Sequence, residues 1–231
     1  FVDDGSTDDT PRVLERLRTE HPARVSVFRV ERNGGKAEAV RRGVLVALPQ
    51  RPAFGGYWDA DLATPLEAVP KFRAVFDDRP GISLVMGSRV PLLGRQIRRR
   101  RTRQVLGRAF ATAASWVLRL PVFDTQCGAK LFRVTSVTAA VFQQAFRSRW
   151  IFDVEILARM MSATSRAAEA IYEFPLERWE DVAGSRLRMR DFAVAAGDLA
   201  AIRWWYRPSR TIAEAAKHLA DDETIVLRDA A

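Results

Sequence analysis

The sequence predicts an α/β domain whose open sheet is mixed but mainly parallel and is flanked by helices. Three observations predict this class. Apolar runs alternate with helical patterns in the first half of the chain, acidic turns follow the ends of those runs, and a Gly-containing loop at residues 33–35 opens a helix. Strands that alternate with helices are typical of α/β folds with parallel sheets.

The elements of the first half follow from local patterns. Thr10 and Pro11 predict a helix start, because Thr caps helices and Pro suits the first helical position. The pattern Thr64–Glu67 resembles a capping box and predicts a helix that runs to about residue 76. The other expected elements are strands at 25–30, 56–59 and 82–86 and a helix at 36–48.

The second half is less regular. Apolar residues recur at steps of one, three and four between 99 and 119, which predicts a helix. Further helices are expected at 135–146, 154–161 and 189–206, and a strand at 168–174. Pro208 is expected to end the globular domain, so the chain divides into a domain at 1–207 and a tail at 208–231.

Composition limits the class of protein. The chain has 231 residues and a net charge of +9, and 48% of its residues are hydrophobic. The single cysteine, Cys127, excludes a disulfide scaffold, and two histidines make a zinc site built on imidazole improbable. No apolar run is long enough for a membrane-spanning helix. The basic excess indicates an anionic partner, either nucleic acid, a membrane surface or a phosphorylated substrate.

The first residues read as the end of a strand. Phe1 and Val2 lead directly into an acidic turn, and two residues are too few for a buried strand. We therefore expect that the chain lacks its true beginning.

Two candidate ligand-binding turns lie near the start. Asp3 and Asp4 follow the first apolar residues, at the strand end where α/β sheets bind ligands, and could accept hydrogen bonds from a ribose or a base. Residues 33–35 and Lys36 open a helix, where glycine lets backbone approach phosphate. The alternatives are a plain capped turn and a loop with a solvated lysine.

A third site centres on Asp59 and Asp61, which follow a short apolar strand. Two carboxylates at a strand end can hold Mg²⁺ or Mn²⁺, which prefer oxygen ligands and share them with substrate phosphates. The alternative is a pair of solvated turn acids, because this spacing alone is a weak pattern.

Basic residues supply the remaining candidates. Arg89 follows a buried strand, and the segment 97–103 contains five arginines in seven residues. Guanidinium groups bind phosphate with two hydrogen bonds, although most of these arginines are expected to be solvated or near lipid. The segment 124–132 adds an acid, a glycine and a lysine, which are not diagnostic as chemistry alone.

Together these motifs resemble the family 2 glycosyltransferases with the Rossmann-like GT-A fold, and within them the dolichyl-phosphate (polyprenyl-phosphate) β-glucosyltransferases. The resemblance covers residues 1 to about 206 and is carried by VDDGSTDDT, NGGKAEAVRRG, DADLATP, GSR, DTQCGAKLF and WIFDVEIL. DTQCGAKLF with WIFDVEIL is its most specific part. Such relatives begin with a strand and a helix before VDDGSTD, so we expect a nucleotide site that is incomplete on the uracil side.

The resemblance implies a role for each matching residue. On the donor side, Asp3 and Asp4 would bind the base and ribose with Lys36 nearby, and Asp59 and Asp61 would hold the metal ion. On the acceptor side, the implied phosphate ligands are Arg89, Arg103 and Lys130, the register of Arg103 being open. Asp124 would take the place of the proposed catalytic aspartate, and Trp150 and Asp153 would shape the pocket.

Two positions narrow the reaction. Ala63 stands where mannose-transferring relatives often carry an amide, and Phe146 stands where processive synthases carry Gln. The resemblance therefore implies transfer of glucose from UDP-glucose to a polyprenyl phosphate, with inversion at the sugar carbon and a divalent ion as cofactor. The alternatives are mannosyl transfer from GDP-mannose, another acceptor, or a nucleic-acid-binding or membrane-binding module without catalysis.

A lipid-linked acceptor requires contact with a membrane. Arginines precede an amphipathic stretch at 104–123 that includes Trp116, and a second stretch ends at 202–206 with three aromatic residues. Basic residues beside Trp, Tyr and Leu suit helices that lie in the headgroup region. We expect peripheral binding at the cytoplasmic face of a membrane, against the alternative that these apolar faces belong to the core.

Overall fold

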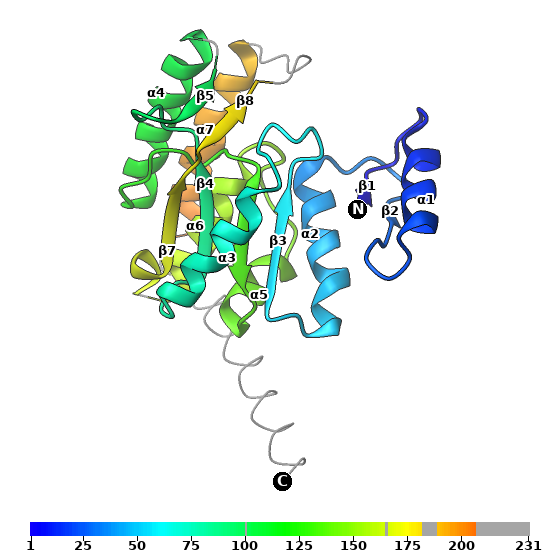
Figure 1. Ribbon diagram of the computed structural model, residues 1–231. Coiled ribbons are helices and arrows are strands. Elements are labelled where there is room, and N and C mark those ends of the chain that lie inside the picture. The colour runs from blue at the N-terminus through cyan, green and yellow to red at the C-terminus, as the bar shows by residue number, and fades with distance from the viewer. Residues whose placement is uncertain (100, 165, 182–188, 207–231) are drawn as a thin grey trace.

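A four-stranded sheet forms the centre of the molecule. The computed structural model describes residues 1–99, 101–164, 166–181 and 189–206. The sheet has the order β3 (Phe54–Trp58), β6 (Ala129–Arg133), β4 (Leu84–Ser88) and β7 (Ile171–Pro175). β6 is antiparallel to both of its neighbours, and β4 and β7 are parallel. Three strands therefore share one direction, and β6, which we did not expect from the sequence, runs against them (Figure 1).

Two small parallel sheets lie on either side of this centre. β1 (Val2–Asp3) pairs with β2 (Phe28–Arg29), next to helix α1, and β5 (Gln96–Arg98) pairs with β8 (Arg178–Glu180) near helix α4 (Figure 1). The strand expected at 25–30 is thus confined to two residues.

Helices pack on both faces of the central sheet, except α1, which lies beside the small sheet of β1 and β2 (Figure 1). They are α1 (Thr10–Glu20), α2 (Lys36–Ala47), α3 (Ala68–Asp78), α4 (Arg101–Leu118), α5 (Ser136–Gln143), α6 (Phe152–Ala163) and α7 (Met189–Trp205), with short 3₁₀ turns at Leu48–Gln50 and Ala167–Ala170. On β4, Leu84 and Met86 face the core shared with α2, α5 and α6, whereas Val85 faces the core under α3. This alternation is the period of a strand buried on both sides.

Two helix starts differ from the expectation. α1 begins at Thr10 itself, and Asp9 is its N-cap. The pattern at Thr64–Glu67 does not cap a helix: Thr64 is buried, and α3 begins only at Ala68 without a side-chain cap. Burial of Thr64 against Cys127 takes its hydroxyl away from the backbone.

A reciprocal capping box forms instead at the start of α5. Thr135 and Thr138 each accept a hydrogen bond from the backbone N–H of the other, which satisfies two N–H groups. The expected tail at 208–231 lies outside the described residues. In the part of the chain that the structure describes, no helix is long and apolar enough to span a membrane.

Candidate active site

The acidic turn after β1 is tied to the loop before α2. The carboxylate of Asp4 accepts hydrogen bonds from Gly34 N at 2.9 Å and Gly35 N at 2.7 Å. The two motifs that were expected to bind a nucleotide therefore form one unit, although their residues lie about 30 positions apart. Because both carboxylate oxygens of Asp4 accept hydrogen bonds from this loop, Asp4 fixes the position of the loop before α2.

Asp3 keeps one carboxylate oxygen available. Its Oδ1 accepts a hydrogen bond from Ser6 N at 2.9 Å. Hydrogen bonding to the side chain of Ser6, and then to its backbone, holds the pKa of Asp3 below its ordinary value. Its Oδ2 is buried without a hydrogen bond in the described part of the chain, although Arg29 Nε lies 3.4 Å away. A buried acceptor without a donor is costly, so the geometry suits a donor from a bound ligand.

Asp59 lies at the end of β3, between Lys36 and Gly128. Lys36 Nζ is 2.5 Å from Asp59 Oδ1, so the lysine that opens α2 pairs with the expected metal ligand. A Cβ atom at position 128 would lie 1.9 Å from Asp59 Oδ2. Only glycine can stand at the start of β6 while the Asp59 carboxylate keeps this position.

Asp59 and Asp61 supply oxygen donors that fit a shared divalent ion. Asp61 is exposed, and its Oδ1 accepts a hydrogen bond from Ala63 N at 3.0 Å. No group of three or more His, Cys, Asp or Glu side chains able to hold a metal occurs among the described residues. Mg²⁺ is commonly held by one or two carboxylates together with substrate phosphates, so two acids on one turn are sufficient donors.

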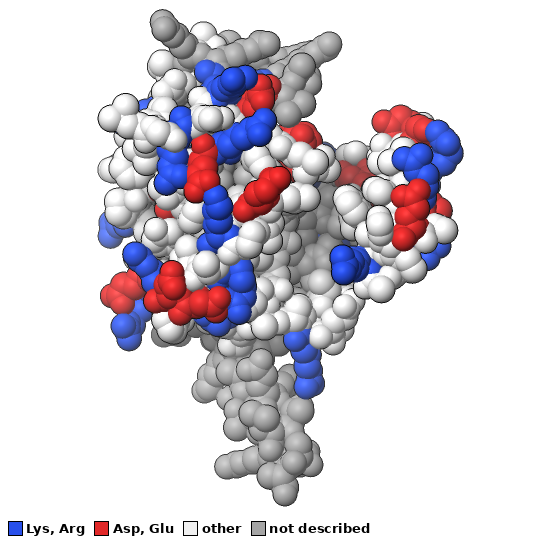
Figure 2. All heavy atoms as spheres, viewed as in Figure 1, with Lys and Arg blue, Asp and Glu red and all other residues white. Residues whose placement is uncertain are grey.

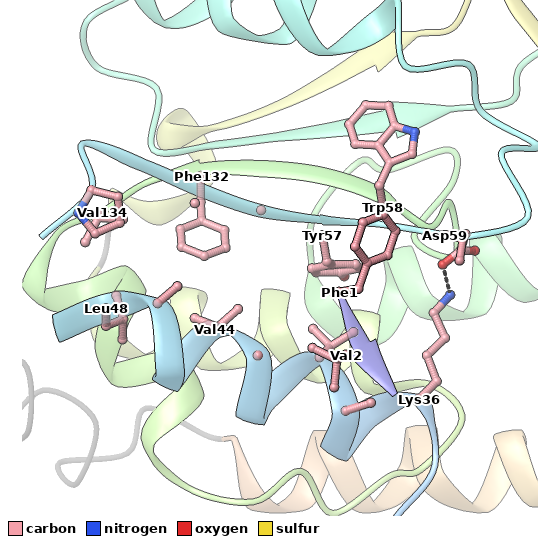
Figure 3. A pocket seen from close by; sticks show the side chains of 18 of the residues that line it. Phe1, Val2, Lys36, Val44, Leu48, Tyr57, Trp58, Asp59, Phe132 and Val134 are labelled. Carbon is pink, nitrogen blue, oxygen red and sulfur yellow. Dashed lines mark ion pairs between the residues drawn. The ribbon is translucent and has the colours of Figure 1, made fainter. Parts of the chain in front are cut away.

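A pocket of about 640 Å³ opens beside these acids. Its walls are mostly apolar and come largely from β1, α2 and β3, with Asp59 and Lys36 at one end (Figure 3). Asp61 also lines it. Figure 2 shows a hollow between the lobe that carries α1 and the body of the molecule.

Asp124 and Arg89, the residue that follows β4, form a buried ion pair. Arg89 Nε and Nη2 lie 2.6 and 2.7 Å from the two carboxylate oxygens, and the Arg89 backbone N–H also donates to Asp124. Burial alone would raise the pKa of Asp124, but the Arg89 charge and these hydrogen bonds lower it below its ordinary value. Asp124 is therefore an anion at neutral pH.

Glu173 holds the backbone that carries Asp124. Its two carboxylate oxygens accept hydrogen bonds from Phe123 N and Asp124 N, at 2.9 and 2.6 Å. Burial raises the pKa of Glu173. The sequence offered one signal for this residue, an acid between two aromatic residues near the end of the strand expected at 168–174.

Lys130 does not lie where the resemblance implied. It is completely buried, and its Nζ donates to Thr125 O, Cys127 O and Asp153 Oδ1 at 3.0, 2.8 and 2.5 Å. Asp153 also accepts a hydrogen bond from Tyr57 OH at 2.5 Å. All three ammonium protons have partners inside the protein, so Lys130 holds the 124–128 loop and is not available to a phosphate. Asp153 thus lines the second pocket while pairing with Lys130 and Tyr57.

Arg103 also has an internal partner. Its guanidinium pairs with Asp181, just after β8, and both side chains are mostly buried. Asp181 was not among the expected site residues, because only the fold brings it to the start of α4. Arg100 and the side chain of Arg101 lie outside the described part of the run.

These groups surround a second pocket of about 300 Å³. Its lining includes Arg89, Arg99, Arg103, Asp124 and Trp150, together with apolar side chains of α4. Lys36 lines both pockets. The structure thus brings Lys36, Asp59 and Asp61 of the expected donor residues to the first pocket, and Arg89 and Arg103 of the expected acceptor residues to the second. Asp3 and Asp4 line neither pocket.

This arrangement defines a class of protein. An α/β fold with acids at the end of β3, next to a pocket lined by arginines, is the architecture of GT-A glycosyltransferases. The family model for Glycosyl transferase family 2 matches residues 1–140. The chain belongs to this family.

Within this family, the chain is similar to curated enzymes of one name. The chain is 31% identical over 224 residues to the dolichyl-phosphate beta-glucosyltransferase of Saccharomyces cerevisiae, with 89% of this chain and 64% of the relative covered. It is 29% identical over 213 residues to the enzyme of that name from Dictyostelium discoideum, with 89% and 62% covered. The chain therefore spans about three fifths of the length of these relatives.

Solved structures confirm the fold. Glucosyl-3-phosphoglycerate synthase from Mycobacterium tuberculosis in complex with UDP has a TM-score of 0.59 and 20% identity, with 89% of this chain and 67% of that chain covered. The same enzyme with Mn²⁺, UDP and glucosyl-3-phosphoglycerate has a TM-score of 0.58 and 20% identity, with 87% and 65% covered.

Proposed function

We propose that the protein transfers glucose from UDP-glucose to a dolichyl-type polyprenyl phosphate, with inversion at the sugar carbon. The relatives named dolichyl-phosphate beta-glucosyltransferase support glucose as the sugar and dolichyl phosphate as the acceptor. A solved structure of the same fold in complex with Mn²⁺ and UDP-glucose supports the nucleotide. The observation that carries it is the junction at Lys36, where an acid-bearing pocket meets an arginine-lined pocket. One pocket suits a nucleotide diphosphate with its ion, and the other suits a second phosphate.

The donor side is built around Asp59, Asp61 and Lys36. The two aspartates would hold Mg²⁺ or Mn²⁺ on the diphosphate, and the ion would act as a Lewis acid toward the departing UDP. Asp3 has a buried oxygen that accepts no hydrogen bond in the described part of the chain, and this oxygen offers an acceptor to a donor group of the nucleoside. Gly34 and Gly35, whose N–H groups are held by Asp4, have no side chains and would let a phosphate approach the backbone at the start of α2.

The reaction exchanges one bond at the sugar carbon for another. The bond from C1 to the UDP oxygen breaks, and an acceptor phosphate oxygen forms a new bond to C1 from the opposite face. A phosphate monoester has its second pKa near ~6, so it is largely dianionic at neutral pH and needs no general base. Asp124 is anionic and bound to Arg89, which suits a role in positioning and electrostatics.

Membrane contact is part of the proposal. Val105, Trp116 and Trp204 are each about 70% exposed on α4 and α7, and Phe123 follows α4 at 62% exposed. α4 and α7 pack together, with Arg203 over the Trp116 ring. Large apolar side chains beside basic ones suit a helix pair lying in the headgroup region, at the cytoplasmic face of a membrane.

A donor panel tests the proposal. The protein is incubated with polyprenyl phosphate, Mn²⁺ and either UDP-glucose or GDP-mannose, and the lipid-linked product is measured. We expect a glucosylated lipid only with UDP-glucose. A mannosylated lipid would support the alternative donor, which Ala63 disfavours, and no lipid product with either donor would refute transfer to this acceptor.

A further inference from the structure

One partly buried arginine of the second pocket has no acidic partner among the described residues. Arg99 lies between the end of β5 and the start of α4 and lines the pocket with Arg89 and Asp124. In the part of the chain that the structure describes, no carboxylate lies within ion-pair distance of its guanidinium. Burial and the nearby charge of Arg89 both lower the pKa of Arg99. Its charge is therefore held in a place that disfavours it.

Other charged side chains that line the second pocket form ion pairs. Arg89 is matched by Asp124, Arg103 by Asp181, and Lys36 by Asp59. Among the described residues, Arg99 and Arg108 of this lining have no acidic partner, and because Arg108 is exposed, Arg99 is the one that leaves an excess positive charge within the pocket wall. A buried excess charge is expensive unless an ion of opposite sign neutralises it.

The helix opposite Arg99 leaves room for its guanidinium. A Cβ atom at Gly107, in the second turn of α4, would lie 2.6 Å from Arg99 Nη2 and 3.1 Å from Cζ. Glycine in the interior of a helix lowers stability relative to alanine, so the residue is unfavourable for α4 itself. Its effect is to let Arg99 lie against the helix axis and face the pocket.

We propose that Arg99 is the principal ligand of the acceptor's phosphate, and that Gly107 determines its position. This inference rests on the proposed function, and it replaces Lys130 and Arg103, whose charges are already matched inside the protein. The chemistry recognised is a phosphate monoester dianion. Its two sources, a lipid headgroup and free phosphate, differ in the apolar chain that would contact Leu106 and Phe123 in the same pocket.

Binding measurements test the proposal without catalysis. The dissociation constant of geranylgeranyl phosphate is measured by isothermal titration calorimetry in detergent, with geranylgeraniol and inorganic phosphate as separate probes. We expect Arg99→Ala to weaken binding of the phosphorylated lipid by roughly 10-fold to 100-fold, the range for a hydrogen bond between charged groups. Arg98→Ala removes an exposed charge from the same segment and is the matched control.

A second variant keeps the charge and moves it. Gly107→Ala should displace the Arg99 guanidinium and weaken lipid phosphate binding, while its thermal unfolding midpoint stays level or rises, because alanine favours the helix. Gly197→Ala in α7 is the control, since a Cβ there meets nothing within 4 Å. A loss of binding without a loss of stability separates a ligand-positioning role from a structural one.

The outcomes are separable. Equal binding by the Arg99→Ala and Arg98→Ala variants, or no binding of geranylgeranyl phosphate by the unmodified protein, would overturn the inference. Stronger binding of inorganic phosphate than of geranylgeranyl phosphate would show that the site binds free phosphate, and would contradict a lipid acceptor. If the lipid binds through Arg99 but the donor panel yields no product, the proposed function fails and the Arg99 site stands.

Discussion

Individual side chains show which motif residues face the pockets and which support them. Asp3, Asp59 and Asp61 each keep a carboxylate oxygen that accepts no hydrogen bond from the described residues. Asp4 and Asp153 accept hydrogen bonds from within the protein, and Lys130 donates its ammonium protons there. Sequence reasoning placed the acids correctly at strand ends, because strand and turn patterns are local. It could not assign the pairings of Asp4 with Gly34 or Arg89 with Asp124, because the partners lie 30 or more positions apart.

Gly128 offers a test of the Asp59 position. Gly128→Ala would force the carboxylate away and separate Asp59 from Lys36. We expect a loss of about 1–3 kcal/mol in the free energy of unfolding from overpacking, together with weaker UDP binding. Urea unfolding and a thermal shift with UDP measure the two effects. Gly81→Ala, where a Cβ meets nothing within 4 Å, should change neither; unaltered UDP binding in Gly128→Ala would contradict the assignment.

Lys130 distinguishes a structural role from a phosphate-binding one. Lys130→Met leaves Asp153 buried with only Tyr57 as a partner. Removing one member of a buried ion pair costs about 3–5 kcal/mol, so urea unfolding should show a loss of that order. A variant with unchanged stability but a raised KM for the lipid acceptor would restore the role that the resemblance implied.

At the scale of elements, the least predictable strand is β6. Its residues Ala129–Arg133 include Lys130, which interrupts the apolar pattern, and the charge is tolerated only because Asp153 on α6 lies beneath it. The capping pattern at Thr64 failed for a related reason, since tertiary packing buried its hydroxyl. α2 and α4 were predicted well, because their apolar periodicity is sustained over three turns or more. α7 was also predicted to within one residue, although its apolar residues are not confined to one face.

The α4 and α7 pair carries a prediction about membranes. Replacing Trp116 and Trp204 by Ser removes two exposed indoles from that face. We expect several-fold less flotation with anionic liposomes at low salt, because interfacial affinity scales with buried apolar area. Val13→Ser, an exposed apolar residue on the distant α1, serves as the control (Figure 1). Equal flotation of both variants would place the membrane contact elsewhere.

At the scale of the whole molecule, two adjoining pockets on one sheet define the site. The α/β fold class, the glycosyltransferase family and the position of the acids at strand ends were predictable from the order of the motifs. The division into one central and two flanking sheets was not, because it depends on pairings that no local pattern contains. The positive charge is not spread as one patch on the face in Figure 2, where Lys and Arg are interspersed with Asp and Glu.

Ligand linkage tests the whole fold. UDP with Mn²⁺ should raise the thermal midpoint, by an amount that corresponds to about 2.7 kcal/mol when UDP is at a hundred times its dissociation constant. EDTA should remove most of this gain, and Asp59→Asn should abolish it. Stabilisation by an oligonucleotide in place of UDP would favour the nucleic-acid-binding alternative.

Lys36 belongs to both pockets and pairs with Asp59, which has a kinetic consequence. When a diphosphate and its cation occupy the acid-bearing end, Asp59 no longer needs the lysine as a partner, and Lys36 can turn its charge toward the second pocket. We therefore expect an ordered mechanism in which the donor binds first. Acceptor affinity should rise about 5-fold or more when UDP and Mn²⁺ are present, within the usual range of coupling between sites. Lys36→Met should bring that ratio to one, whereas a ratio unchanged by the substitution would show that the two substrates bind independently of this lysine.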